Sequence, residues 1–322
     1  MIRLSACLAA LAFAASCASP GAAPSSPAAQ QAAADPYLWL EEVEGERALA
    51  WVHEQNNRSL PVLENDPRYA GLLNAALEVA QSRDRLPLGQ IRGGYLYNFW
   101  QDPEHVRGIL RRAPLDGYAA NNPRWETVLD IDALAAAENA NWVYQGADCD
   151  PAGVRCMISL SNGGLDASTD REFDLQTRQF VDGGFVVPEA KSNVGWLDRD
   201  TLLVATNWGE GSLTESGYPF ILKAWRRGTP LSSAAEIMRG EASDVSISVA
   251  TFEDESSDHI AIAVEAETFF ETVYSLITPQ GPQRLTLPRK SSIRDFFQDR
   301  LIVTIEEAWT IGGRTYPTGS LL

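Results

Sequence analysis

The chain has 322 residues and a formal net charge of −17, with 43 acidic against 26 basic side chains. Its 45% hydrophobic and 21% charged residues are typical of a folded globular protein. The charge excludes binding to nucleic acid through phosphates, and binding to an anionic membrane through basic clusters, because both need excess positive charge. Three histidines and four cysteines leave little material for a metal site, so we expect neither metal nor cofactor.

Residues 1–34 predict a signal peptide followed by an Ala/Pro/Ser-rich tether. Arg3 supplies the positive start, and residues 4–15 form an apolar stretch that is too short to span a membrane comfortably. Cys17 follows small residues in a pattern that resembles a bacterial lipoprotein box, which predicts acylation of Cys17; ordinary cleavage within residues 18–34 is the alternative. Both place the mature chain outside the cytoplasm, either in the periplasm or anchored to the outer membrane of a bacterium. A lipid anchor would be its only membrane contact.

Residues 35–85 predict a lead-in of two amphipathic helices. The first covers residues 45–59, and Pro61 interrupts it because proline removes a backbone donor. Asp66 and Pro67 start the second, as helix cap and first helical residue. Each helix has one apolar side, so both are expected to pack on the following β region or on a part of the protein outside this chain.

From residue 86 the apolar residues follow the period of β-strands. Similar apolar strands start near residues 95, 156, 202, 260 and 301, at steps of roughly fifty residues. Each unit holds three or four short strands, which is the length of a β-propeller blade. Residues 86–322 therefore predict a mainly β fold, an incomplete propeller of about four to five blades. Because such a set does not close a ring, we expect this chain to be a piece of a longer protein.

Cys149 and Cys156 are separated by a short turn-forming segment. In an oxidising compartment they could close a disulfide across a hairpin, and two unpaired thiols are the alternative. A zinc site is not favoured, because no second cysteine pair or nearby histidine completes four ligands.

Several motifs, in order along residues 35–322, resemble the amino-terminal portion of the prolyl oligopeptidase family of serine peptidases. They are DPYLWLEE (35–42), NFWQD (98–102), REFDL (171–175), GFVVPEAKS (184–192), WLDRDTLLV (196–204), LTESGYP (213–219) and WRRGTPL (225–231). The resemblance implies a seven-bladed propeller that caps an α/β-hydrolase domain with a Ser-Asp-His triad. Members of the family cleave short peptides, typically after proline. Their triad lies beyond the portion that this chain resembles, so the resemblance assigns no catalytic residue here.

The residues themselves also predict no catalytic site within this chain. Ser161 lacks the upstream glycine of a Gly-x-Ser-x-Gly elbow, and a strand rather than a helix follows it. Acidic pairs such as Glu306 and Glu307 are too common in this sequence to favour a two-carboxylate glycosidase. Trp208 lies in a Gly-rich loop and is a candidate for lining a substrate passage, with packing between blades as the alternative.

These patterns predict the helical lead-in and partial propeller of an exported serine oligopeptidase. Its propeller would act as a size-selecting lid, and its α/β-hydrolase domain would be absent from this chain. Short peptides would be its partners through that missing domain, and the chain alone would be inactive. The alternative hypothesis is a non-catalytic propeller lipoprotein that acts as a peptide-binding or scaffold module.

Overall fold

The computed structural model of the protein describes residues 35–42, 44–253 and 259–322. The predicted signal peptide, the tether and Cys17 lie outside these residues. The chain divides into two compact units, Met1–Asn74 and Ala75–Leu322, and each is described by itself. Among the described residues, no helix combines the length and the apolar character needed to cross a membrane.

The first unit contains a short 3₁₀ helix, η1 (Leu38–Glu41), and α1 (Glu46–Glu64). Trp39 packs edge-on against Trp51 of α1, with ring centroids 6.3 Å apart. The expectation that Pro61 interrupts the helix is wrong, because α1 continues through Pro61 to Glu64. A proline removes only one backbone donor, and the last turn keeps its remaining partners; the N–H of Asn65 still donates to the carbonyl of Pro61 (3.2 Å).

Helix α2 (Tyr69–Gln81) runs across the division between the units. The N–H of Arg68, just before it, donates to the Asp66 carboxylate (2.9 Å), so Asp66 orders the start of the helix. None of the residues of α2 is buried, and its leucines are largely exposed.

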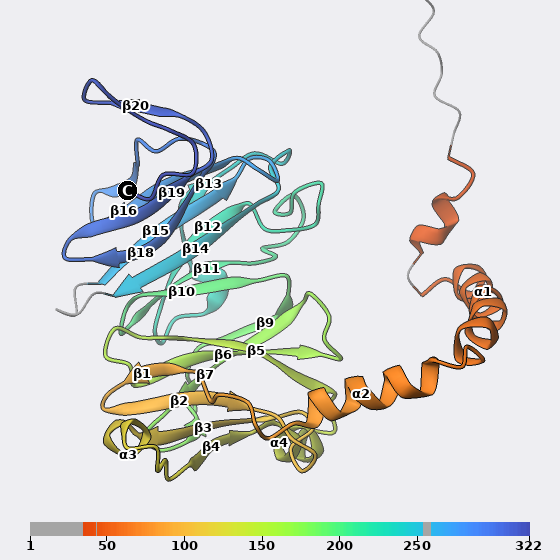
Figure 1. Ribbon diagram of the computed structural model, residues 1–322. Coiled ribbons are helices and arrows are strands. Elements are labelled where there is room, and N and C mark those ends of the chain that lie inside the picture. Colours follow the sequence, from red (N-terminus) through yellow and green to blue (C-terminus); the bar gives the residue numbers. More distant parts are fainter. Residues whose placement is uncertain (1–34, 43, 254–258) are drawn as a thin grey trace, which may run out of the picture. The chain divides into compact units, whose positions relative to one another are not determined.

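The second unit is built from antiparallel sheets that follow one another in chain order (Figure 1). The first sheet comprises β1 (Gln90–Arg92), β2 (Tyr95–Trp100), β3 (Ile109–Pro114) and β4 (Glu126–Asp130). The second comprises β5 (Trp142–Cys149), β6 (Arg155–Asn162), β7 (Ser168–Asp174), β8 (Gln179–Phe180) and β9 (Val186–Ala190). The third comprises β10 (Asn193–Asp198), β11 (Thr201–Ala205), β12 (Ile221–Arg226) and β13 (Ala235–Arg239). The fourth comprises β14 (Ser246–Glu253), β15 (His259–Ala266), β16 (Thr272–Thr278) and β17 (Gly281–Arg284).

Two short strand pairs complete the unit, β18 (Ser291–Phe297) with β19 (Arg300–Ile305) and β20 (Trp309–Ile311) with β21 (Arg314–Tyr316). Short helices lie in the connections: α3 (Leu115–Ala119), α4 (Ile131–Glu138) and η2 (Leu231–Ser233). The prediction of a mainly antiparallel β fold is confirmed.

The internal repeat corresponds to one position in each sheet. The strands predicted near residues 95, 156, 202, 260 and 301 are β2, β6, β11, β15 and β19, which are the second strands of successive sheets. Of these, β6, β11 and β15 pair on both sides and lie in the middle of the series of sheets, so apolar residues on both of their faces are buried. The sequence therefore marks these strands most strongly.

The core consists of three seams, where the faces of consecutive sheets pack together. In the first seam, Ile158 and Leu160 of β6 pack against residues of the first sheet and α4. In the second seam, Met157 of β6 packs on the third sheet, beside Trp196. In the third seam, the third and fourth sheets meet through Leu203 and its neighbours. Successive residues of one strand enter opposite seams because side chains alternate between the faces of a sheet.

Candidate functional site

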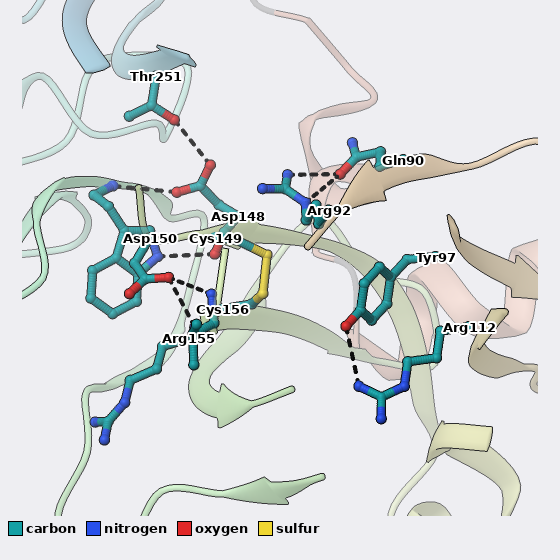
Figure 2. The surroundings of a disulfide bond; sticks show 12 residues. Gln90, Arg92, Tyr97, Arg112, Asp148, Cys149, Asp150, Arg155, Cys156 and Thr251 are labelled. Atoms are coloured by element: carbon teal, nitrogen blue, oxygen red, sulfur yellow. Dashed lines mark hydrogen bonds between the residues drawn. A yellow bond between two sulfur atoms is a disulfide. The ribbon is translucent and has the colours of Figure 1, made fainter. Parts of the chain in front are cut away.

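The first strands of neighbouring sheets, β5, β10 and β14, contact one another. Asp148 of β5 joins all three: its carboxylate accepts from the hydroxyl of Thr251 in β14 (3.1 Å) and from the N–H of Trp196 in β10 (3.3 Å). The indole of Trp196 donates in turn to the carbonyl of Asp148 (3.0 Å). Burial raises the pKa of Asp148 above its ordinary value, although these hydrogen bonds oppose the rise. Figure 2 shows the Asp148 carboxyl group turned toward Thr251.

Two further contacts hold β10 against β14 and β15. The side-chain oxygen of Asn193 accepts from the N–H of Val249 (2.6 Å), and Nε2 of His259 lies 2.6 Å from the carbonyl oxygen of Trp196. Gly195 sits so close to β14 that a Cβ atom there would lie 2.9 Å from side-chain atoms of Thr251 and Val249. The first strands therefore form a tightly connected centre.

One end of the sheets receives the incoming chain, and we call it the near end. It contains the turn between the second and third strands of each sheet, at residues 101–108, 163–167, 206–220 and 267–271. The segment before β1 reaches this end, because Arg83 pairs with Glu104 (2.9 Å) and the amide of Asn98 donates to the carbonyl of Leu88 (2.7 Å).

Large apolar side chains are exposed at the tips of these near-end turns. Phe269 and Phe270 are 86% and 74% exposed, and Val106 and Leu165 occupy equivalent turns of the first and second sheets. Exposed apolar groups gathered at one end are typical of a surface that another part or partner covers. These residues were not predicted from the sequence, although two adjacent phenylalanines between strands are a visible signal.

A polar cavity of about 410 Å³ opens beside these turns, lined by Ser159, Ser168, Ser192 and Tyr218 among others. Next to it, Nζ of Lys191 lies 3.8 Å from the Asp166 carboxylate and 4.3 Å above the Tyr218 ring. Hydroxyl groups of this kind can accept and donate hydrogen bonds to a peptide backbone.

Cys149 and Cys156 face each other across the β5–β6 hairpin and are joined by a disulfide (Figure 2). The buried carboxylate of Asp150 orders the turn between them, because it accepts from the N–H groups of Val154 (2.8 Å) and Arg155 (2.9 Å). The hairpin is thus fixed both covalently and by its turn.

Trp208 lies at the start of the β11–β12 loop. Its indole donates to the carbonyl of Ile221 (3.0 Å), and the ammonium of Lys223 lies 4.4 Å above its ring. The ring also packs against the apolar cluster of the second seam. Trp208 thus contacts both β12 and the second seam.

Ser161 and the histidines of the β region lie in separate environments. Ser161 is buried in β6, where its hydroxyl accepts from the amide of Gln145 (2.8 Å). His105 contacts Asp102 (3.0 Å) in a near-end turn, and His259 contacts the carbonyl of Trp196. Across the described ranges of the chain, no serine is hydrogen-bonded to a histidine.

Asp102, Glu104 and His105 bring three potential metal ligands together in the first near-end turn. The carboxylate of Asp102 already accepts from the N–H of His105 (2.9 Å), the N–H of Glu104 (3.0 Å) and the indole of Trp100 (3.1 Å). Burial works against its charge, but these hydrogen bonds lower its pKa to about 2. The arrangement serves to order the turn.

Comparison with known families gives one match over most of the chain. Residues 23–299 match the family described as prolyl oligopeptidase, N-terminal β-propeller domain. The matched range covers all four large sheets and β18, and it ends directly before β19.

Curated and solved relatives are about twice as long as this chain. It is 36% identical to an uncharacterized peptidase, y4nA, of Sinorhizobium fredii over 302 residues, which are 91% of this chain and 42% of the relative. It is 26% identical to an uncharacterized peptidase of Rickettsia prowazekii, over 88% of this chain and 41% of the relative. The solved structure of a post-proline cleaving enzyme from Rickettsia typhi superposes with a TM-score of 0.78 at 25% identity, over 88% of this chain and 43% of that one.

Proposed function

This chain belongs to the prolyl oligopeptidase family, as its amino-terminal propeller portion, and from that premise we propose that it serves as the size-selecting lid of an exported serine peptidase. The family match over residues 23–299 is the observation that carries the proposal. The peptidase would cleave short peptides, because a propeller in front of a catalytic centre keeps folded proteins away from it. The post-proline cleaving activity of the Rickettsia typhi relative suggests proline-containing peptides as substrates.

The catalytic serine, acid and histidine of this peptidase would lie outside the 322 residues. The chain spans less than half the length of its relatives, which leaves room in them for a second domain. The exposed near-end residues Val106, Leu165, Phe269 and Phe270 would face that domain, since burying them there removes apolar area from water.

The protein would act outside the cytoplasm. The signal-like residues 1–34 support this proposal, and so does the disulfide between Cys149 and Cys156, because disulfides persist mainly in oxidising compartments. Acylation of Cys17 would hold it at the outer membrane. Cell fractionation with wild type and Cys17→Ser tests both points: the variant should move from the membrane to the soluble periplasm. Recovery of wild type in the cytoplasm would contradict export.

Reading the gene downstream of Leu322 tests the proposed function. An in-frame continuation that encodes a Gly-x-Ser-x-Gly elbow supports a propeller that serves a catalytic domain. A stop codon directly after Leu322 would contradict it and favour the alternative, a non-catalytic propeller lipoprotein that binds peptides or acts as a scaffold.

A further inference from the structure

A second cavity, of about 300 Å³, lies in the first seam beside the disulfide. Its wall combines aromatic and aliphatic side chains with a polar edge formed by Gln90 and Arg92 of β1. A volume of this size and a mostly apolar lining with few polar groups are typical of sites for small molecules. Nothing in the proposed peptidase function uses this cavity.

Its apolar wall has a defined shape. The rings of Phe99 and Tyr144 stack with centroids 4.5 Å apart and planes inclined by 18°, and Leu110 and Leu175 line the cavity beside them. The Cys149–Cys156 disulfide forms another part of the wall and ties β5 to β6 there. A flat apolar group would fit against these side chains.

Arg92 brings a positive charge to the edge of this cavity. Its Nε and Nη2 atoms both donate to one oxygen of Gln90, at 3.3 and 2.8 Å, which fixes the guanidinium but leaves other N–H groups of its fork free (Figure 2). Within the described ranges, Arg92 forms no ion pair. The other nearby cation, Arg112, is already engaged by Glu126 (3.2 Å) and by the carbonyl of Leu175 (3.1 Å).

Tyr144 adds a neutral hydrogen-bond donor. Burial raises its pKa to about 12, and the charge of Arg92 opposes that rise, which places the phenol within the field of the guanidinium. Its hydroxyl has no hydrogen-bond partner among the described residues. The charge of Arg92 also acts on Asp148, whose carboxylate accepts from Thr251 and Trp196 and is turned toward Thr251 (Figure 2).

We propose that this cavity binds a small carboxylate with an apolar or aromatic body. The carboxylate would accept from the Arg92 guanidinium and the Tyr144 hydroxyl, and the body would lie against Phe99 and Leu110. Planar guanidinium groups bind carboxylates through paired hydrogen bonds, which are stronger than bonds between neutral groups. Two sources share this chemistry: a free aromatic acid, and the carboxy-terminal residue of a short peptide.

Calorimetric titration of the purified protein tests the proposal with three probes: phenylpropionate, N-acetyl-Gly-Phe and N-acetyl-Gly-Phe amide. We expect at least one of the two acids to bind, and the amide to bind about tenfold more weakly than its parent acid, because it lacks the charge that Arg92 recognises. Binding of phenylpropionate alone identifies a free acid as the ligand, whereas binding of N-acetyl-Gly-Phe identifies a peptide end.

Variants separate this site from unspecific binding. Arg92→Gln should lower the affinity for the acid about tenfold, and Tyr144→Phe should lower it severalfold. Arg314→Gln, at an exposed arginine on β21, should leave the affinity unchanged. Urea unfolding of each variant verifies that it is folded. Three results would overturn the proposal. They are equal affinity for acid and amide, unchanged affinity in both Arg92→Gln and Tyr144→Phe, and no binding of either acid to wild type. None of these outcomes bears on the presence of a catalytic domain.

Discussion

The first and second seams use opposite faces of the same sheet and bury different kinds of group. The first seam is apolar: Ile158, Leu160 and Phe173 pack on the first sheet, and beside them a cavity of about 300 Å³ remains. The second seam buries a charge. The side chain of Glu172 is 0% exposed and accepts from Arg155 of its own sheet and from Arg227 of the third sheet.

The contrast shows two ways of joining neighbouring sheets. Apolar contacts are not directional, so the first seam tolerates a gap between its sheets. The second seam requires the two sheets to be positioned accurately, because its hydrogen bonds are directional. Glu172 accepts from Arg227 at 2.8 and 2.9 Å, from Arg155 at 3.1 Å and from the N–H of Phe185 at 2.8 Å. A small shift between the second and third sheets would leave these groups buried without partners, and that cost fixes the register of the two sheets.

Replacing Glu172 should give the largest effect. Glu172→Gln removes the buried carboxylate that both guanidinium groups share in the second seam and leaves them only Asp200 (3.0 Å from Arg227) and Asp174 (3.9 Å from Arg155). We therefore expect the free energy of unfolding to fall by about 3 kcal/mol. Urea denaturation measures it. Glu236→Gln is the matched control, because its pair with Arg239 (2.7 Å) is exposed, and it should cause no measurable loss. Equal losses in the two variants would show that the buried pair has no special role.

Removing the disulfide should have the next largest effect, in the first seam. Cys149→Ala with Cys156→Ala opens a short loop, and we expect the free energy of unfolding to fall by about 2 kcal/mol, since the unfolded chain gains freedom. Dithiothreitol should lower the stability of wild type by a similar amount and leave the double variant unchanged. A reductant effect of equal size in both proteins would show that the disulfide does not support this seam.

A methyl group in the third seam tests close packing without changing charge. In Gly195→Ala the new Cβ meets Thr251 and Val249 at 2.9 Å, so β10 must move from β14, at a cost of about 1 kcal/mol. Gly71→Ala serves as the control, because nothing lies within 4 Å of that position in α2 and alanine favours helix. Thermal unfolding should separate the two, and a stable Gly195→Ala variant would contradict the close approach of these strands.

The pH dependence of stability should be the subtlest difference. Burial opposes the charge of Glu172, but hydrogen bonds from Arg227, from the Phe185 backbone and from Arg155 hold its pKa below the ordinary 4.5. Its stabilisation is therefore present above pH 4.5 and is lost as the pH falls through the lowered pKa.

Asp170, in the same seam, should behave with the opposite sign. Burial raises its pKa above 3.8, and one of its carboxylate oxygens has no partner among the described residues. Its protonated form stabilises the fold below pH 3.8, and that contribution is lost as the pH rises through the raised pKa. Asp170→Asn should therefore gain stability relative to wild type as the pH rises above 3.8, whereas Glu172→Gln loses it. Parallel curves for the two variants would refute this assignment.

The sequence predicted the second strands well and missed the first ones. β6, β11 and β15 carry apolar residues on both faces, which gives a strong signal. The first strands β5, β10, β14 and β18 were not predicted, because small and polar residues such as Gly195 and Asp148 interrupt their apolar pattern. Those same residues make the contacts between sheets, so the signal is weakest where the long-range contacts concentrate.

The candidate sites were predicted in part for a similar reason. The Cys149–Cys156 spacing pointed to a hairpin disulfide, and that bond depends on neighbours along the chain. The seam cavity depends on Arg92 and Tyr144, which lie on different sheets and share no motif. Helix α4 was also missed, although Asp130 caps it by accepting from the N–H of Ala133 (2.9 Å) and an alanine-rich run follows.

Hydrolysis of a chromogenic proline peptide tests the central claim most directly. The purified 322-residue chain and the full product of its gene are assayed side by side, each with and without a reagent that blocks active serines. We predict that the chain alone leaves the peptide intact and that the longer product cleaves it until the reagent is added. Reagent-sensitive cleavage by the 322 residues alone would contradict a lid without catalytic residues.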